Sequence, residues 1–388
     1  MGANRSILTL TALLVTFLAI AADSVRVSLV TFYPGSEIFE LYGHTELRVT
    51  QGSSDYYFNY GVFDFEAPDF TGRFISGATD YMCVALPAQY ATVGMEGRKM
   101  VEQDLNLTQA QAEALRDALI MNVQPANSTY RYRYFGDNCS TRPRDMIERT
   151  IGTAVKYPVT AADTTTVTLH DIVSHYNRNY AWERLGIDLA LGSDIDKPID
   201  GRQMMFVPML LMEAMSGATI ERGDSVVSLV TQTRVMVEGS DDGTVLSPTP
   251  TWLSPLTVFA TVLLLLLVIA WHDVRRRRAC RIIDAAVYTL AGIMGCLLAY
   301  LVLVSTHEAT SPNWNLMWLH PGYIAGAVAV FGSSRLSRAI HCTLIIVLAL
   351  AAIVWHFTGQ HFNPAFVPVM LIIALTALKQ VYFKRVDF

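Results

Sequence analysis

The sequence predicts an α+β domain that is exported across a membrane, followed by an all-α membrane domain of about five helices. The chain of 388 residues is 52% hydrophobic and only 16% charged, whereas soluble globular proteins carry about a quarter charged residues. An apolar segment opens the chain, and nearly continuous apolar runs begin after residue 251. Residues 1–250 contain 19 Lys and Arg against 30 Asp and Glu, a net charge of −11, and residues 251–388 contain 10 against 4, a net charge of +6.

Residues 1–22 are predicted to be a signal peptide. Arg5 precedes an uncharged stretch that runs from Ile7 to Ala22 and ends in small residues at the Ala-x-Ala spacing of a cleavage site. An uncleaved anchor is the alternative, and either form would export the domain that comes after it. We therefore expect residues 23–237 to form a periplasmic domain. Residues 238–252, rich in Ser, Thr, Asp, Gly and Pro, are expected to be a linker.

Residues 253–388 are predicted to form the membrane domain. The candidate spans are 253–271, 282–305, 316–332, 340–357 and 365–383. A crossing helix needs roughly 17–25 residues, so the third and fourth are minimal, and Lys379 is expected to reach the aqueous interface from the end of the last. All ten Lys and Arg lie in or next to residues 272–281, 333–338 and 385–388. Because basic loops remain in the cytoplasm, this distribution places the C-terminus there and the exported domain outside.

The composition also excludes several kinds of site. The acidic first half has no basic run, which argues against a nucleic-acid partner. The five cysteines, at positions 83, 139, 280, 296 and 342, have neither a CxxC pair nor the spacing of zinc ligands. We therefore predict no metal and no cofactor.

Hydrophobic periodicity predicts two strands and two helices in the exported domain. Residues 44–49 alternate as a strand with His44, Glu46 and Arg48 on one face. Residues 56–65 form a second strand with a turn or bulge at Gly61. Residues 108–123 have helical spacing after an N-capping Thr108. Residues 137–150 are the second predicted helix.

The start of that second helix carries the main candidate for chemistry. If Asp137 or Asn138 caps the helix, Cys139 lies in the first turn, where unpaired N–H groups and the helix dipole favour a thiolate. Arg142 and Arg144 are expected to lower the thiol pKa further, so Cys139 is a candidate nucleophile.

The spacing also allows two structural alternatives, a Cys83–Cys139 disulfide and an inert buried thiol. Three histidines compete for the role of base, namely His44, His170 and His175, and the pattern alone does not choose among them.

Several segments resemble one known family in order along the chain. The exported segments are 41–49 (LYGHTELRV), 59–65 (NYGVFDF), 137–145 (DNCSTRPRD), 188–192 with Asp196, and 206–208. The membrane segments are 313–319 (NWNLMWL) and 360–364 (QHFNP). Together they resemble the Lnb family, the lipoprotein N-acyltransferases of Bacteroides-type bacteria.

The resemblance implies a permuted papain-like thiol enzyme of the NlpC type, in which the histidine strand precedes the cysteine helix. His44 is then the base and Cys139 the nucleophile, and His170 and His175 become second choices. It does not fix the residue that orients the base. The supporting candidates are Glu46, Asn59, Asp64, Asn138, Arg142 and Asp145.

The activity implied by the resemblance is acyl transfer in the bacterial inner membrane. A fatty acyl group would move from a membrane phospholipid, through a Cys139 thioester, to the N-terminal amine of a lipidated lipoprotein. The N–H of Cys139 or Ser140 would stabilise the oxyanion. Two other functions are considered: an envelope cysteine hydrolase or peptidase that uses the same dyad, and a non-enzymatic binding protein with a Cys83–Cys139 disulfide.

Overall fold

The computed structural model describes residues 24–386 except 64–65, 67, 159, 161–162, 164–165 and 240–246. The predicted signal peptide and most of the predicted linker therefore lie outside the described residues. The chain forms two compact units. The first contains residues up to Phe70, Thr79–Thr165 and Asp200–Leu246; the second contains Thr71–Ala78, Thr166–Ile199 and Ser247–Phe388. Two segments within residues 23–237, Thr71–Ala78 and Thr166–Ile199, therefore group with the C-terminal helices.

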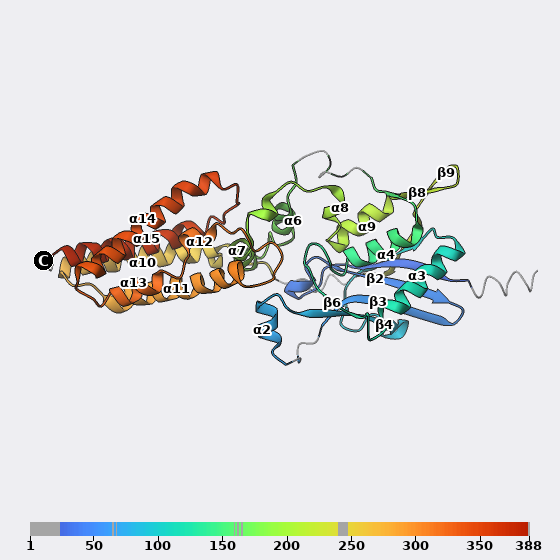
Figure 1. The fold of residues 1–388 in the computed structure, drawn as a ribbon, viewed down its shortest axis with the longest axis horizontal. Coiled ribbons are helices and arrows are strands. Elements are labelled where there is room, and N and C mark those ends of the chain that lie inside the picture. The colour runs from blue at the N-terminus through green and yellow to red at the C-terminus, as the bar shows by residue number, and fades with distance from the viewer. Residues whose placement is uncertain are drawn as a thin grey trace, which may run out of the picture. The chain divides into compact units, whose positions relative to one another are not determined.

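The first unit is built on a seven-stranded antiparallel sheet (Figure 1). Its order is β10 (Val230–Val237), β5 (Met100–Leu105), β1 (Arg26–Phe32), β2 (His44–Gln51), β3 (Ser54–Val62), β4 (Asp80–Pro87) and β6 (Thr129–Arg131). The two predicted strands are confirmed as β2 and β3. The bulge predicted at Gly61 is also confirmed, since the register with β4 shifts between Tyr60 and Val62 and Gly61 has a φ of +96°.

Helices cover one face of this sheet. Helices α3 (Gln109–Asn122), α4 (Thr141–Ile151) and α9 (Pro208–Ser216) share one apolar core with the strands. Leu47 and Phe58 project into that core from β2 and β3, and Leu115 and Ile147 meet them from α3 and α4. Because strand side chains alternate, His44 and Glu46 of β2 lie on the opposite face.

The remaining elements of this unit are short. They are η1 (Ile38–Glu40), η2 (Ala88–Tyr90), α8 (Gly201–Met204) and a small sheet of β7 (Val155–Lys156), β8 (Thr219–Arg222) and β9 (Ser225–Ser228). The first unit therefore mixes helices and antiparallel strands, as the α+β prediction requires.

The second unit contains four helices that are long and apolar enough to cross a membrane, among the residues described. They are α10 (Pro255–Arg276), α11 (Arg281–Leu303), α14 (Arg335–Val354, extended by η5, Trp355–Phe357) and α15 (Phe366–Val386). Shorter helices accompany them: α2 (Phe70–Ile75, mostly in this unit), α6 (Leu169–Tyr176), α7 (Ala181–Ala190) and η3 (Ser193–Asp196).

The third predicted span, 316–332, is not one continuous helix. It forms α12 (Asn315–Trp318) and α13 (Tyr323–Ala329), separated at Pro321, which cannot continue a helical hydrogen-bond ladder. The break packs closely on α11: a Cβ at Gly295 would lie 2.4 Å from the carbonyl carbon of His320, and one at Gly292 would lie 2.5 Å from Ile324. Glycines on α11 therefore make room for a broken helix that hydropathy alone cannot distinguish from a span.

Lys379 does not extend to an interface as predicted. Its ammonium is buried and lies 2.9 Å from Asp273 of α10 and 2.7 Å from Asp284 of α11. Since a buried charge needs charged partners, this pairing ties α15 to both helices. The prediction failed because the two aspartates are about a hundred residues away in the sequence.

Candidate active site

Cys139 lies immediately before α4, where Asn138 organises the backbone. The Asn138 Oδ1 accepts hydrogen bonds from the N–H of Ser140 (2.8 Å) and of Thr141 (2.9 Å). Its Nδ2 donates to the carbonyl oxygens of Tyr134 (2.9 Å) and Phe206 (2.8 Å). The helix begins at Thr141, four residues later than predicted, and the Asn138 side chain satisfies N–H groups at its start that the helix itself leaves unpaired.

His44 is the first residue of β2, after a tight turn at Gly43. That turn requires glycine, because its φ is +82° and a Cβ would lie 2.7 Å from the Phe32 carbonyl oxygen. The His44 Nε2 lies 3.0 Å from the Asn59 Oδ1 on β3. An amide oxygen only accepts, so this contact makes Nε2 the donor and leaves Nδ1 as the basic nitrogen.

The cysteine and histidine segments meet at the end of the sheet. The backbone of Thr45, the residue after His44, hydrogen-bonds to the Cys139 thiol, as does the backbone of Cys139 itself. On the β3 side, a Cβ at Gly61 would lie only 3.6 Å from the Cys139 Cβ. The structure therefore brings Cys139 to the strands that carry His44 and Asn59.

The ionisation of the pair differs from the sequence-based expectation. Burial raises the pKa of the Cys139 thiol to about 11 and lowers the pKa of His44 to about 4. Burial outweighs the effect expected of Arg142 and Arg144, which pair with Asp137 (2.8 Å) and Asp145 (2.8 Å). The resting pair is a neutral thiol and a neutral imidazole, not a thiolate.

Glu46 is a second unusual group in the site. Its side chain is fully buried, one carboxylate oxygen lies 3.6 Å from the His44 Nε2, and neither oxygen has a hydrogen-bond partner among the described residues. Burial raises the pKa of Glu46 to about 8, although the charge of Arg98 opposes the shift. Glu46 is therefore a neutral acid at pH 7.

Arg98 was missed by the sequence analysis. It is buried, and its guanidinium donates to the Tyr33 carbonyl oxygen (2.7 Å) and to Glu40 (3.0 Å). Its charge acts on Cys139, His44 and Glu46. A single arginine more than forty residues from each of these has no local signal in the sequence.

Arg142 and Asp145, two other predicted site residues, contact side chains other than Cys139 and His44. Arg142 lies over the ring of Tyr130, 3.4 Å from its centroid, and Asp145 also pairs with Arg202 (2.8 Å). Asp64 lies outside the described residues. Cys83 is buried on β4, and both Cys83 and Cys139 are free thiols, which contradicts the disulfide alternative.

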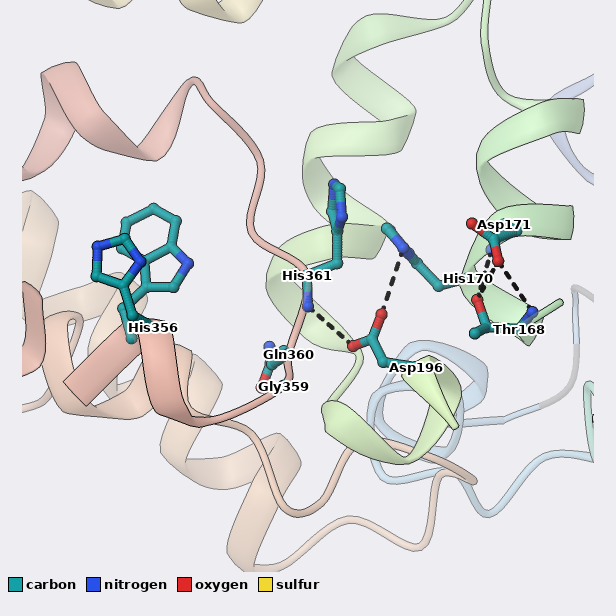
Figure 2. A pocket seen from close by; sticks show the side chains of 9 residues that line it. Thr168, His170, Asp171, Asp196, His356, Gly359, Gln360 and His361 are labelled. Atoms are coloured by element: carbon teal, nitrogen blue, oxygen red, sulfur yellow. Dashed lines mark hydrogen bonds and ion pairs between the residues drawn. The ribbon is translucent and has the colours of Figure 1, made fainter. Parts of the chain in front are cut away.

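His170 and His175 both belong to the second unit. The His170 Nε2 lies 3.0 Å from Asp188. Its Nδ1 lies 3.4 Å from Asp196, whose other oxygen accepts from the His361 N–H (Figure 2). This cluster borders a cavity of about 410 Å³. His170 is thus buried between two carboxylates, and His175 is exposed on α6. In the described part of the chain, no group of three or more His, Cys, Asp or Glu could hold a metal ion.

Replacing Glu46 with glutamine should change how stability depends on pH. The folded state holds a proton on Glu46 that the unfolded state releases, so wild-type stability is fully present below about pH 4.5 and declines as the pH rises to about 8. E46Q should lack this decline and be more stable at pH 8, by on the order of 4 kcal/mol. Thermal unfolding of the detergent-solubilised protein between pH 5 and 9 measures this.

The matched control is E213Q, an exposed glutamate on α9. It should reproduce the wild-type curve. Parallel curves for E46Q and wild type would show that Glu46 is ionised in the folded protein.

Two family models match the chain. One, described as the Lnb N-terminal periplasmic domain, matches residues 17–174, and the other, described as the Lnb transmembrane domain, matches residues 247–386. No curated protein and no solved structure matches it. The first match contains His44, Asn59 and Cys139, and the second contains all four apolar helices.

Proposed function

Because the chain belongs to the Lnb family, with a periplasmic domain and a membrane domain, we propose that it is a membrane-anchored cysteine acyltransferase of the cell envelope. The observation that carries this proposal is the Cys139 thiol beside the β2 backbone, with His44 and Asn59 held together at 3.0 Å. The proposed reaction moves a fatty acyl group from a phospholipid to the N-terminal amine of a lipidated lipoprotein.

The first half-reaction makes a thioester. The His44 Nδ1 takes the thiol proton as the Cys139 sulfur attacks the carbonyl carbon of the donor ester. The carbon–oxygen bond to glycerol then breaks, and His44 gives the proton to the departing oxygen, which leaves a lysolipid. Asn59 holds the imidazole in the tautomer that this step needs.

The second half-reaction forms the amide. The lipoprotein amine attacks the thioester carbonyl, His44 takes a proton from the amine, and the carbon–sulfur bond breaks. His44 then returns that proton to the sulfur, so the site is restored.

A neutral resting pair suits this chemistry. At pH 7 a thiol with a pKa of about 11 is ionised in only about one molecule in ten thousand. Proton transfer therefore accompanies attack on a bound ester, and the free enzyme holds little thiolate for side reactions.

The oxyanion donors also differ from the expected set. The Ser140 N–H already donates to Asn138. The backbone groups that face the sulfur are those of Cys139 and Thr45, so we assign these two N–H groups to the oxyanion of each tetrahedral intermediate.

We also propose the location and topology. The basic segments of the second half would face the cytoplasm, together with the C-terminus, and the membrane would be the bacterial inner membrane. The fold relationship to permuted papain-like thiol enzymes is part of this proposal.

The intermediate provides the test. Purified protein mixed with donor phospholipid and no acceptor should accumulate a fatty acyl group on Cys139, seen as a mass shift of its peptide that hydroxylamine removes. Adding a lipoprotein peptide with a free amine should discharge it into an amide. N-acylated product without any thioester on rapid quenching would contradict the mechanism. A thioester released only to water would instead favour the envelope hydrolase.

A further inference from the structure

The first unit contains a second cavity, of about 540 Å³, beside α4. Gly136 and Asp137 line it, and they precede Cys139 by three and two residues. Tyr60 lines it as well, and the next residue, Gly61, packs against Cys139. Two chain segments therefore connect this cavity to the nucleophile.

Arginines dominate the polar lining of the cavity. Four arginines and two aspartates face it: Arg131, Arg133, Arg142, Arg149, Asp137 and Asp145. This excess of positive charge occurs in a half of the chain whose net charge is −11. A solvated surface of such a domain would not be expected to gather four guanidinium groups around one hollow.

The carboxylates do not neutralise all of these arginines. Asp137 is held by Arg142, and Asp145 is held from outside the cavity by Arg144 and Arg202.

The remaining arginines are exposed. Arg131 lies 3.1 Å from Asp80, and the Arg149 Nε donates to a backbone carbonyl oxygen, which leaves its charge in place. Arg133 has no carboxylate partner among the described residues.

We propose that this cavity binds the phosphate group of the donor phospholipid. The inference rests on the proposed function, and it identifies the phosphate as the part of the donor that the enzyme recognises. Guanidinium groups bind phosphate oxygens through paired, charge-assisted hydrogen bonds, and Arg133 and Arg149 are the two that are available for this. Glycerol links the phosphate to the ester by a few bonds, so a headgroup held here presents its ester toward residues 136–139. Asp137 and Asp145 also border the site, but their arginine partners offset their repulsion of an anion.

The test compares two acyl donors on the full-length protein. Formation of the Cys139 thioester is measured with phosphatidylglycerol and with diacylglycerol, which has the same ester but no phosphate. The double variant R133Q/R149Q should raise the KM for phosphatidylglycerol by about tenfold or more and change kcat less than about twofold. Its activity with diacylglycerol should equal that of wild type.

The control variant R116Q/K156Q removes two positive charges, from the half-buried Arg116 and the exposed Lys156, neither of which lines the cavity. It should leave both donors unaffected, which separates recognition in the cavity from attraction of the whole domain to an anionic surface. Unfolding temperatures of both double variants check that the fold is intact.

Three outcomes overturn the inference. The first is an unchanged KM for phosphatidylglycerol in R133Q/R149Q, and the second is an equal loss of activity with both donors. The third is competition by inorganic phosphate as strong as that by a short-chain phospholipid, which would indicate a site for free anions. Absence of a thioester from either donor in wild type would instead refute the proposed function, so the two failures are distinguishable.

Discussion

Replacing Cys139 with alanine or serine is expected to abolish acyl transfer, with a loss of at least about a thousandfold, while the protein stays folded. Alanine removes the atom that carries the acyl group. Serine keeps the shape, but its hydroxyl is far less acidic than a thiol, and a base with a pKa of about 4 cannot ionise it effectively. Mass spectrometry of lipoprotein N-termini from cells with and without the variants measures the loss.

The control for this prediction is Cys83→Ala. Cys83 lies in the apolar core on β4, and it is a free thiol whose pKa burial raises to about 12. The variant should lose some stability through the small cavity that it creates and keep most of its activity. If C83A were as inactive as C139A and peptide mapping found a Cys83–Cys139 disulfide, the catalytic role of Cys139 would be refuted.

Local patterns predicted the strand that contains His44 and the helix that follows Cys139. Alternation identified β2 with His44 on its polar face, and the helix predicted over residues 137–150 is α4, which begins two residues after Cys139. Helix α3 and its Thr108 cap were predicted almost to the residue, because the capping box and the apolar spacing are both local. The bulge at Gly61 was also predictable, because a glycine inside a strand pattern is itself a local signal.

The electrostatics of the site could not be predicted in the same way. The sequence places Arg142 three residues from Cys139, but the structure pairs its guanidinium with Asp137, and desolvation raises the pKa of the thiol. The pKa of a buried group depends on everything packed around it, including the charge of Arg98, which lies just before β5. The same limit explains Lys379, whose two aspartate partners come from distant helices.

Replacing His44 with alanine is the second change with a large expected effect. General base catalysis is worth about a hundredfold to ten-thousandfold, so H44A should lose acyl transfer by that factor and form the Cys139 thioester correspondingly slowly. His175→Ala should cost little, because that residue is exposed on α6. His170→Ala should lower stability, because His170 is buried between Asp188 and Asp196.

The pH dependence separates a catalytic from a structural role for His44. Burial lowers its pKa from 6.5 to about 4, so the imidazole remains neutral, and able to accept a proton, well below the usual range. The wild-type rate of thioester formation should therefore be flat from about pH 7 to pH 5 and decline only as the pH approaches 4. A larger loss of activity in H170A than in H44A, measured on folded protein, would identify His170, which follows Cys139 in the chain, as the base. His44 would then be a structural residue. A decline centred near pH 6.5 would mean that the base is a fully solvated histidine, whereas the His44 side chain is only 16% exposed and its pKa is lowered to about 4.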